Sequence, residues 1–431
     1  PGCPDGGRIF LYRGSKKDVP ECIRYLEKQK VLVRHVPVLP GTQKMNDPWQ
    51  AIRAEMEERR EKQLYRSLQC VATPQCDWVE AAGERRLMLA SNSYLGLVDE
   101  PRVKQAAMEA VENYGTGSGG SRLTTGNLLL HEELEQALAH AKGTEAALLF
   151  NTGYMANVGI LSALGNQDTV IFSDELNHAS IIDGCRLSRA RTVVYRHNDM
   201  RELEEKIRQN PAARGIIVSD AVFSMDGDIA CLPQILELAE RYQLFSMVDE
   251  AHATGVIGKT GQGIVEYYGL TKKPDILMGT LSKALASEGG YVCGSQLLIE
   301  YLRNTARSFI FSTSLAPASL GAAKAALQIL SGEPGRVARL QQNTQDFCAA
   351  LKRHGIPAAS ESAIVPLLVG DEGRASRIAA RLFEQGVFLS AIRYPTVAQG
   401  KARLRAALMA THQRDDLVWA AERIAEAWRL Q

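Results

Sequence analysis

The sequence predicts an α/β protein with a large domain built on a mostly parallel central sheet and a smaller carboxyl-terminal α+β domain. From about residue 145 to 295, short apolar strands alternate with helices, such as those over 202–209 and 232–242. This alternation is typical of βαβ units, whose helices cover both faces of a parallel sheet. After Pro334, a helix, short strands such as 362–369 and an amphipathic helix over 417–430 indicate the smaller domain.

The other elements follow from hydrophobic periodicity. Residues 101–113 and 131–142 repeat apolar side chains at helical spacing, and 315–330 has the Ala- and Leu-rich composition of a long connecting helix. Near the start, strands are predicted over 6–12 and 31–36, on either side of a helix over 19–28. We therefore expect an extension with a linker over 1–44, a helical segment over 45–89, the large domain over 90–330 and the small domain over 331–431.

Two predicted strands end in chemically competent side chains. The strand that begins at Phe245 delivers Asp249 and then His252, and the next strand delivers Thr280 and Lys283. Ligands bind beyond the carboxyl ends of strands in such sheets, so these side chains are expected to converge. A lysine for a Schiff base and an aspartate for a pyridinium nitrogen are what pyridoxal phosphate (PLP) chemistry requires. The alternative is that Asp249 caps a helix and Lys283 is a solvated loop residue.

Upstream strands add further parts of a cofactor site. A short apolar run ends at Gly153 and is followed by a helix start, where backbone N–H groups bind anions such as a phosphate. Another strand delivers His178, which is either a ring that stacks on the pyridine or a hydrogen-bonded loop histidine; a third delivers Asp220 and Ser224. The run Asp226-Gly-Asp is typical of a turn rather than a metal site. Since no His/Cys cluster has zinc-ligand spacing, no metal is expected.

Motifs spread along most of the chain carry a family resemblance; they lie at 91–97, 115–127, 177–180, 222–228, 249–255 and 280–283. Together they resemble the α-oxoamine synthases, which condense an amino acid with an acyl-CoA thioester on PLP and release CO2. The resemblance covers about residues 45–431 and implies the PLP-dependent transferase fold of type I. Within the family, it implies the condensation of L-alanine with pimeloyl-CoA to 8-amino-7-oxononanoate, CoA and CO2, a step of biotin biosynthesis.

The resemblance assigns the cofactor-binding roles position by position. Lys283 is the expected Schiff-base lysine and proton shuttle, Asp249 is expected at the pyridine nitrogen, and His252 at the phenolic oxygen. His178 is expected to stack on the ring. A homodimer is also implied, with the site between subunits. The residues expected to hold the cofactor and its phosphate are Gly153, Tyr154, Ser224 and Thr280, with Ser312 and Thr313 reaching the phosphate of the neighbouring subunit.

Substrate-binding residues are expected mainly near the carboxyl terminus. Arg403 and Arg405 alternate with apolar residues in a predicted strand, so they share one face. On spacing alone they are two arginines on a solvated face. The resemblance assigns Arg405 to the amino-acid carboxylate, which a guanidinium grips with two hydrogen bonds. The other implied substrate-binding residues are Asn92 and His178, with Arg66 and Thr396 at the acyl end.

The sequence departs from the family pattern at two places. Glu250 stands where many members have Asp, and Tyr394 stands where a second Pro is commoner; neither change removes a reactive group. Glycine C-acetyltransferase (2-amino-3-ketobutyrate–CoA ligase) is an alternative within the family, and serine palmitoyltransferase and 5-aminolevulinate synthase are more distant. From another class, the alternative is a non-catalytic PLP-fold subunit of an assembly. The presence of Lys283, Asp249 and His252 argues against it.

The composition is that of an ordinary globular protein. The 431 residues are 45% apolar and 23% charged, with a net charge of +1, which gives no electrostatic reason to expect nucleic acid or a membrane surface as a partner. No apolar run approaches the ~18 residues of a membrane span, and the start does not read as a signal peptide. The 8 scattered Cys indicate reduced thiols, so a cytoplasmic enzyme is expected.

Residues 1–44 lie outside the synthase resemblance. The stretch 7–29 is similar to the carboxyl-terminal tail of 6-carboxyhexanoate–CoA ligase, the enzyme that makes pimeloyl-CoA. We therefore expect a fused or associated ligase, with Met45 as a natural start of the synthase part. The alternative is an unrelated extension.

Overall fold

The computed structural model describes residues 10–13, 33–36, 47–62 and 64–429, and the chain forms two compact units, Pro1–Ser67 and Leu68–Gln431. In the first unit, β1 (Phe10–Arg13) pairs in parallel with β2 (Val33–Val36), and α2 spans Trp49–Glu61. These strands lie where strands were predicted. The predicted helix over 19–28 lies outside the described residues.

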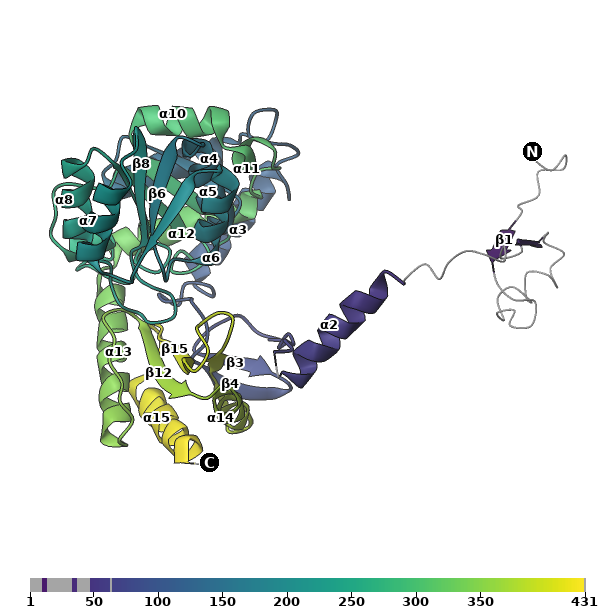
Figure 1. Ribbon diagram of the computed structural model, residues 1–431. Helices are drawn as coiled ribbons and strands as arrows, with labels where there is room; N and C mark the ends of the chain where they lie inside the picture. The colour runs from purple at the N-terminus through teal and green to yellow at the C-terminus, as the bar shows by residue number, and fades with distance from the viewer. Residues whose placement is uncertain (1–9, 14–32, 37–46, 63, 430–431) are drawn as a thin grey trace. The chain divides into compact units, whose positions relative to one another are not determined.

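A seven-stranded sheet forms the centre of the second unit, in the order β5-β11-β10-β9-β8-β6-β7; its neighbouring strands β8 and β6 are labelled in Figure 1. Every neighbouring pair is parallel except those that β11 makes with β10 and β5. β11 returns directly from β10 through a short loop, and such a connection joins antiparallel strands. The predicted, mostly parallel sheet is confirmed. Its strands are β5 (Ala146–Phe150), β6 (Thr169–Asp174), β7 (Arg191–Tyr195), β8 (Arg214–Asp220), β9 (Phe245–Asp249), β10 (Ile276–Thr280) and β11 (Gly290–Gly294).

Helices cover both faces of this sheet, and alternate residues of its strands, except those of the edge strand β7, enter different cores. Leu148 and Phe150 of β5 belong to a core that includes Ile160 of α5, whereas Leu149 belongs to a core that includes Leu134 of α4. The helices thus pack on the faces of the sheet, and the polar residues at the carboxyl ends of the strands lie outside the two cores. The helices are α3 (Pro101–Tyr114), α4 (Leu129–Lys142), α5 (Gly153–Leu164), α6 (Ala179–Ser188), α7 (Met200–Gln209), α8 (Leu232–Arg241), α9 (Ile264–Tyr267), α10 (Gln296–Thr305), α11 (Arg307–Ile310) and α12 (Pro317–Gly332).

Two smaller sheets lie beside the carboxyl-terminal helices α13 (Gly335–Arg353), α14 (Glu372–Glu384) and α15 (Arg414–Arg429) (Figure 1). One has the order β12-β15-β14, from Ile364–Gly370, Ala402–Ala407 and Ser390–Ile392. The other has the order β13-β4-β3, from Val387–Phe388, Glu84–Met88 and Trp78–Ala81. The predicted strand over 362–369 and the predicted last helix are thus found.

The segment over 45–89, expected to be helical, contains strands as well as α2. β3 and β4 form a hairpin whose turn has positive φ at Ala82 and Gly83, and β4 then pairs in parallel with β13. The pairing partner lies at the far end of the chain, so local periodicity gives no sign of it. The division of the second unit at residue 330 stays a prediction.

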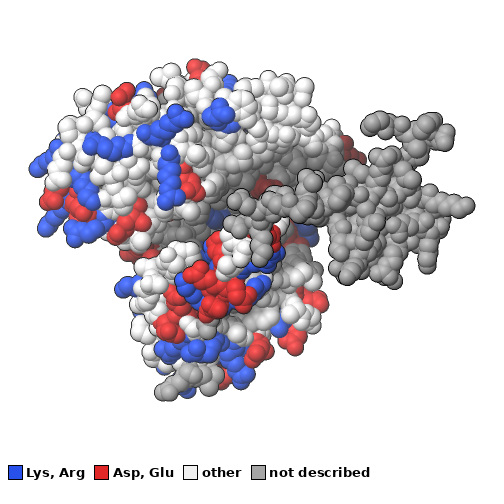
Figure 2. Space-filling model, turned by 45° about the vertical axis from the view of Figure 1, so that its right-hand side comes forward, with Lys and Arg blue, Asp and Glu red and all other residues white. Residues whose placement is uncertain are grey.

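Basic and acidic side chains are interspersed on the face of the molecule that Figure 2 shows, with no large patch of one sign. This distribution accords with the net charge of +1. Within the described ranges, no helix combines the length and the apolar character of a membrane-spanning segment.

Candidate active site

Lys283 lies in the loop that leads from the end of β10 to β11, next to a buried histidine. Its Nζ is 2.9 Å from Nε2 of His252, and Nδ1 of His252 is 2.6 Å from the hydroxyl of Tyr94. Burial lowers the pKa of Lys283 to about 8, against the opposing effect of the Asp249 carboxylate. Burial, together with the nearby Lys283, also holds the pKa of His252 well below its usual value. The site thus contains an amine that is partly neutral near physiological pH, and neutrality is what a nucleophilic lysine needs.

Asp249 ends β9 as a buried carboxylate, 4% exposed. Its Oδ2 accepts a hydrogen bond of 2.7 Å from Nδ2 of Asn157 in α5, and its Oδ1 accepts one of 2.8 Å from the backbone of Ala251. Asn157 also donates to Oγ of Ser180 at 2.9 Å, while its own Oδ1 is buried without a hydrogen-bond partner among the described residues. Two donors therefore fix the carboxylate at the carboxyl end of the sheet.

His178 precedes α6 and is tied to the same strand ends. Its backbone N–H donates to Oδ2 of Asp220 at 2.9 Å, and its Nδ1 lies 2.7 Å from Oγ of Ser180. Burial lowers the pKa of His178, which favours the neutral ring. Burial, and then the neighbouring Asp249, raises the pKa of Asp220 well above its usual value. The register pairs Asp220 with Asp249 at the ends of β8 and β9, so the two acids sit at the same edge.

The amino terminus of α5 meets the end of β10. Thr152 caps this helix by accepting a hydrogen bond of 3.0 Å from the backbone of Met155. A Cβ added to Gly153 would lie 3.3 Å from Oγ1 of Thr280, so glycine permits this close approach. The hydroxyl of Tyr154 donates to Asp183, and Tyr154 is 46% exposed. The first N–H groups of a helix have no partner within it, and they provide an anion site beside Thr280.

Arg405 comes to the site from β15. Its Nε donates to the carbonyl of Ser224, and its Nη2 donates to Oδ1 of Asn92 at 3.1 Å and toward the Tyr94 hydroxyl at 3.5 Å. Arg403 points to the same loop and donates to the carbonyl of Met225 at 3.2 Å. The two arginines thus share a face as predicted, but the alternative of a solvated face is wrong, since each is 7% exposed.

The structure connects most of the predicted residues through two chains of contacts. One runs from Lys283 through His252 and Tyr94 to Arg405. The other runs from Asp249 through Asn157 and Ser180 to His178. The carboxylate of Asp249 affects the pKa of Lys283 and thereby connects the two chains. Sequence reasoning missed Tyr94 and Asn157. The available signals were the position of Tyr94 inside the motif 91–97 and that of Asn157 one helical turn after Gly153.

Three other predicted residues are located by a backbone contact or by their exposure. Thr396 follows β14, and its N–H donates to the carbonyl of Arg393 at 2.9 Å. The carbonyl of Thr313 accepts from Asn151 at 2.6 Å. Arg66 is exposed and belongs to the first unit, so its role at the acyl end stays a prediction. The roles of Ser312 and Thr313 at a neighbouring subunit also stay predictions.

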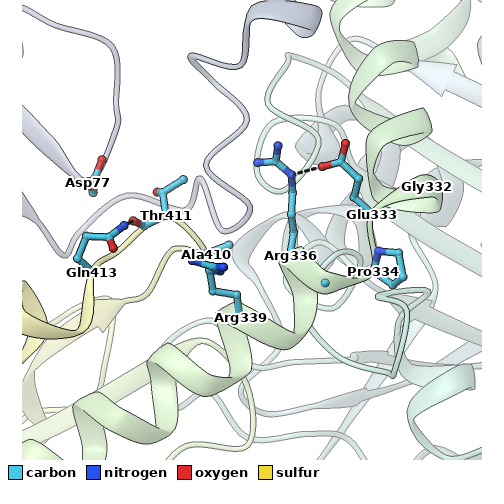
Figure 3. A pocket seen from close by; sticks show the side chains of 10 residues that line it. Asp77, Gly332, Glu333, Pro334, Arg336, Arg339, Ala410, Thr411 and Gln413 are labelled. Atoms are coloured by element: carbon cyan, nitrogen blue, oxygen red, sulfur yellow. Dashed lines mark hydrogen bonds and ion pairs between the residues drawn. The ribbon is translucent and has the colours of Figure 1, made fainter.

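One cavity lies at the start of α13, and a second lies along the loop after β10. One, of about 820 Å³, is lined by residues such as Arg336, Arg339 and Gln413 and contains none of the predicted site residues (Figure 3). The other, of about 560 Å³, is lined by Asn92 and by Ser282, the chain neighbour of Lys283. The second cavity therefore lies along the loop that carries Lys283, although Lys283 itself does not line it.

The residues brought together fit pyridoxal phosphate. Lys283 offers an amine for its aldehyde, Asp249 a buried carboxylate for its ring nitrogen, and the start of α5 an anion site for its phosphate. No group of His, Cys, Asp and Glu side chains in the part of the chain that the structure describes has the arrangement of a metal site. Fold and site together define a PLP-dependent enzyme.

Comparisons with known proteins agree with this class. The sequence profile of the family "Aminotransferase class I and II" matches residues 85–424. The chain is 51% identical over 371 residues to the 8-amino-7-oxononanoate synthase of Geobacter sulfurreducens, covering 85% of this chain and 95% of that protein. It is 47% identical over 375 residues to the 8-amino-7-oxononanoate synthase of Lysinibacillus sphaericus, covering 86% and 96%.

Solved structures give the same result. A structure of SPT with PLP has a TM-score of 0.84 at 30% identity, covering 90% of this chain and 99% of that one. The 8-amino-7-oxononanoate synthase of Francisella tularensis has a TM-score of 0.69 at 30% identity, covering 79% and 97%. The chain belongs to the class I and II aminotransferase family.

Proposed function

We propose that this chain condenses L-alanine with pimeloyl-CoA to give 8-amino-7-oxononanoate, CoA and CO2, as a PLP-dependent acyltransferase of biotin biosynthesis. The observation that carries the proposal is Lys283, an amine with a lowered pKa held by His252 near the buried carboxylate of Asp249. Relatives 47% and 51% identical that bear the name 8-amino-7-oxononanoate synthase support the substrates.

Each residue of the site has a task in this reaction. Bound PLP supplies an electron sink that stabilises negative charge at Cα of the amino acid. Asp249 would hold the ring nitrogen in its charged form, because a nearby carboxylate favours a cation. His252 would hold the phenolic oxygen, His178 the ring face, and the start of α5 the phosphate.

Lys283 moves the proton at Cα. The amine must be neutral to accept this proton, and a pKa of about 8 makes a useful fraction of it neutral near pH 7. Tyr94 and His252, which link Lys283 to Arg405, keep the base and the carboxylate-binding group in one rigid network.

Arg405 binds the carboxylate of the amino acid. Its Nε and Nη2 are already held by Ser224 and Asn92, so the guanidinium is oriented before the substrate arrives. The guanidinium orients the bonds at Cα, and because it is held in place beforehand it loses less conformational freedom when it binds the carboxylate.

The test is the reaction itself, with L-alanine or glycine as amino acid and pimeloyl-CoA or acetyl-CoA as donor. We expect CoA release and a product of the mass of 8-amino-7-oxononanoate with L-alanine and pimeloyl-CoA. A preference for glycine with acetyl-CoA would favour glycine C-acetyltransferase instead. Binding of PLP without turnover of any pair would favour a non-catalytic subunit.

We also infer that the enzyme is a homodimer in the cytoplasm and that a 6-carboxyhexanoate–CoA ligase is fused to it or associated with it. The exposed Phe311, 71% exposed beside Ser312 and Thr313, supports a covering subunit there. The mass measured by light scattering tests the dimer, and an active monomer would refute it. Co-purification of a tagged ligase with the full chain, but not with a chain that begins at Met45, tests the association.

A further inference from the structure

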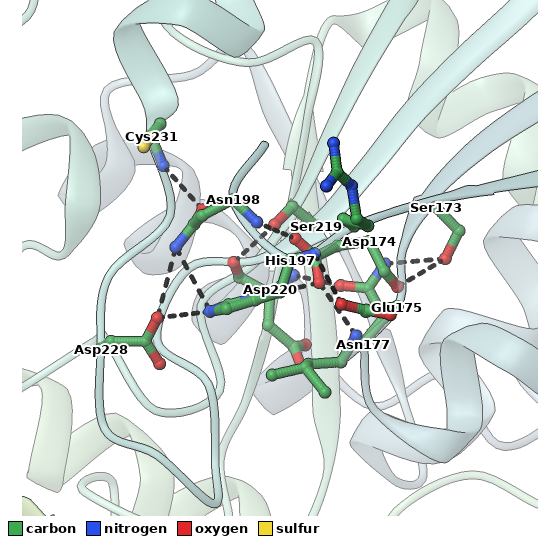
Figure 4. Close-up of polar contacts among 12 residues, drawn as sticks. Ser173, Asp174, Glu175, Asn177, His197, Asn198, Ser219, Asp220, Asp228 and Cys231 are labelled. Atoms are coloured by element: carbon green, nitrogen blue, oxygen red, sulfur yellow. Dashed lines mark hydrogen bonds and ion pairs between the residues drawn. The ribbon is translucent and has the colours of Figure 1, made fainter. Parts of the chain in front are cut away.

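His197 follows β7 and lies between two carboxylates outside the reacting groups. Its Nδ1 is 3.1 Å from Oδ1 of Asp174, and its Nε2 is 2.6 Å from Oδ2 of Asp228 (Figure 4). Both ring nitrogens can donate to carboxylates only when the ring is a cation. Burial opposes the charge, but the hydrogen bonds to Asp174 and Asp228 outweigh it and raise the pKa of His197 to about 10. The ring is therefore charged at physiological pH.

The two carboxylates belong to different loops at the carboxyl edge of the sheet. Asp174 ends β6, and its Oδ1 also accepts from the backbone of Leu176 at 2.9 Å, in the turn that leads to His178. Asp228 closes the turn 222–229, where the N–H of Phe223 donates to its carbonyl at 3.0 Å. His197 thus joins two loops that are far apart in the sequence.

Asn198 strengthens the same connection. Its backbone N–H donates to Oδ2 of Asp174 at 2.9 Å (Figure 4). Its side chain donates to the carbonyl of Ile229 at 3.2 Å. The ring of His197 also packs edge-on against Phe223, with centroids 4.3 Å apart. The turn 222–229 is therefore held from the His197 side by ionic, polar and aromatic contacts.

The same turn holds the substrate arginine from its other side. The carbonyl of Ser224 accepts from Nε of Arg405, and Met225 and Asp226 accept from Arg403. A displacement of the turn would move the carbonyl that orients Arg405. Packed protein interiors transmit small displacements. A shift of the turn after loss of the His197 contacts would therefore move the guanidinium of Arg405.

We propose that His197 is a positioning residue for the amino-acid substrate. As a cation fixed between Asp174 and Asp228, it holds the turn 222–229 so that Ser224 keeps the guanidinium of Arg405 aimed at the substrate carboxylate. This inference rests on the role given to Arg405 in the proposed function.

The test compares His197→Gln with wild type in the PLP-loaded enzyme. Glutamine is neutral and is too short to reach both carboxylates, so the charge-assisted bonds are lost. We expect KM for L-alanine to rise about tenfold, while kcat falls less than about threefold and KM for pimeloyl-CoA is unchanged, since an interaction made equally in ground and transition states affects KM. PLP binding, followed by absorbance, should not change. The matched control is His140→Gln, an exposed histidine at the end of α4.

Asp228→Asn provides a second, independent arm. It should raise KM for L-alanine in the same way, and combining it with His197→Gln should add little, because both remove the same contact. An unchanged KM for L-alanine in His197→Gln overturns the proposal. So does a parallel loss of PLP binding and of both substrates, which would indicate a merely structural role.

The design separates this inference from the proposed function. If wild type uses glycine rather than L-alanine, the comparison is made with glycine, and the failure concerns the proposed substrate alone. A wild type that turns over neither amino acid overturns the proposed function and this inference with it. A wild type active on L-alanine whose KM is unaffected by His197→Gln overturns only the inference.

Discussion

Replacing Asn157 by Ala should weaken the enzyme through the buried carboxylate of Asp249. Nδ2 of Asn157 donates to Oδ2 of Asp249 at 2.7 Å, and the two residues are 1% and 4% exposed. A hydrogen bond to a charged group contributes about 1.5–3 kcal/mol. A change of 1.36 kcal/mol in an activation free energy is a factor of ten in rate. Loss of the hydrogen bond from Asn157 therefore corresponds to roughly a ten- to hundredfold decrease in kcat/KM.

This decrease should appear where Asp249 acts. In the variant, the N–H of Ala251 remains the described donor to the carboxylate, so Asp249 is free to move away from the ring nitrogen. The assay is kcat/KM for L-alanine and pimeloyl-CoA at saturating PLP, together with a PLP titration. Asn304→Ala is the matched control, because Asn304 donates its amide only to a carbonyl in its own exposed helix. A kcat/KM for Asn157→Ala within about threefold of wild type would refute the reasoning, since that loss is below the smallest expected hydrogen-bond contribution.

Further predictions concern the reactive amine, its carboxylate and the core beneath them. Lys283→Ala should lose roughly a hundred- to ten-thousandfold in kcat, because the proton shuttle is removed; a variant that keeps a tenth of the wild-type turnover means that another lysine is used. With a pKa of about 8, the amine is mostly protonated below that pH, so the rate at which apoenzyme captures PLP should rise through about pH 8 and then level off; a rise centred near the ordinary 10.5 contradicts the lowered pKa. Asp249→Asn should still bind PLP by absorbance, but turnover should fall about a hundredfold or more, because breaking a buried charge pair costs about 3–5 kcal/mol; full turnover removes Asp249 from the ring nitrogen. Lys142→Met should lower the free energy of unfolding in urea by about 3–5 kcal/mol, because it leaves Glu250 charged and buried; a change below about 1 kcal/mol shows that the pair is not needed for stability.

The reactive residues could be predicted from the sequence because each follows a strand. Asp249 ends β9, and Lys283 follows soon after the end of the neighbouring parallel strand β10, so that topology alone brings them to one edge of the sheet. Their partners could not be predicted, because those contacts depend on packing between distant segments. Asn157 is 92 residues from Asp249, and Tyr94 is 158 residues from His252. The hairpin of β3 and β4 was missed for a similar reason, since short strands rely on a partner elsewhere in the chain.

The departure at Glu250 illustrates how the fold separates chemistry from support. Asp249 contacts Asn157 of α5, whereas Glu250, the first residue after β9, is directed to the opposite face, where α4 packs. There Oε2 of Glu250 forms an ion pair of 2.6 Å with Nζ of Lys142. Its Oε1 accepts a hydrogen bond of 2.8 Å from the backbone N–H of Ile264. Lys142 also donates to Oγ1 of Thr254 at 2.7 Å, so the pair braces the loop that carries His252. The longer carboxylate is thus part of the support behind the site, which is why the exchange of Asp for Glu leaves every reactive group in place.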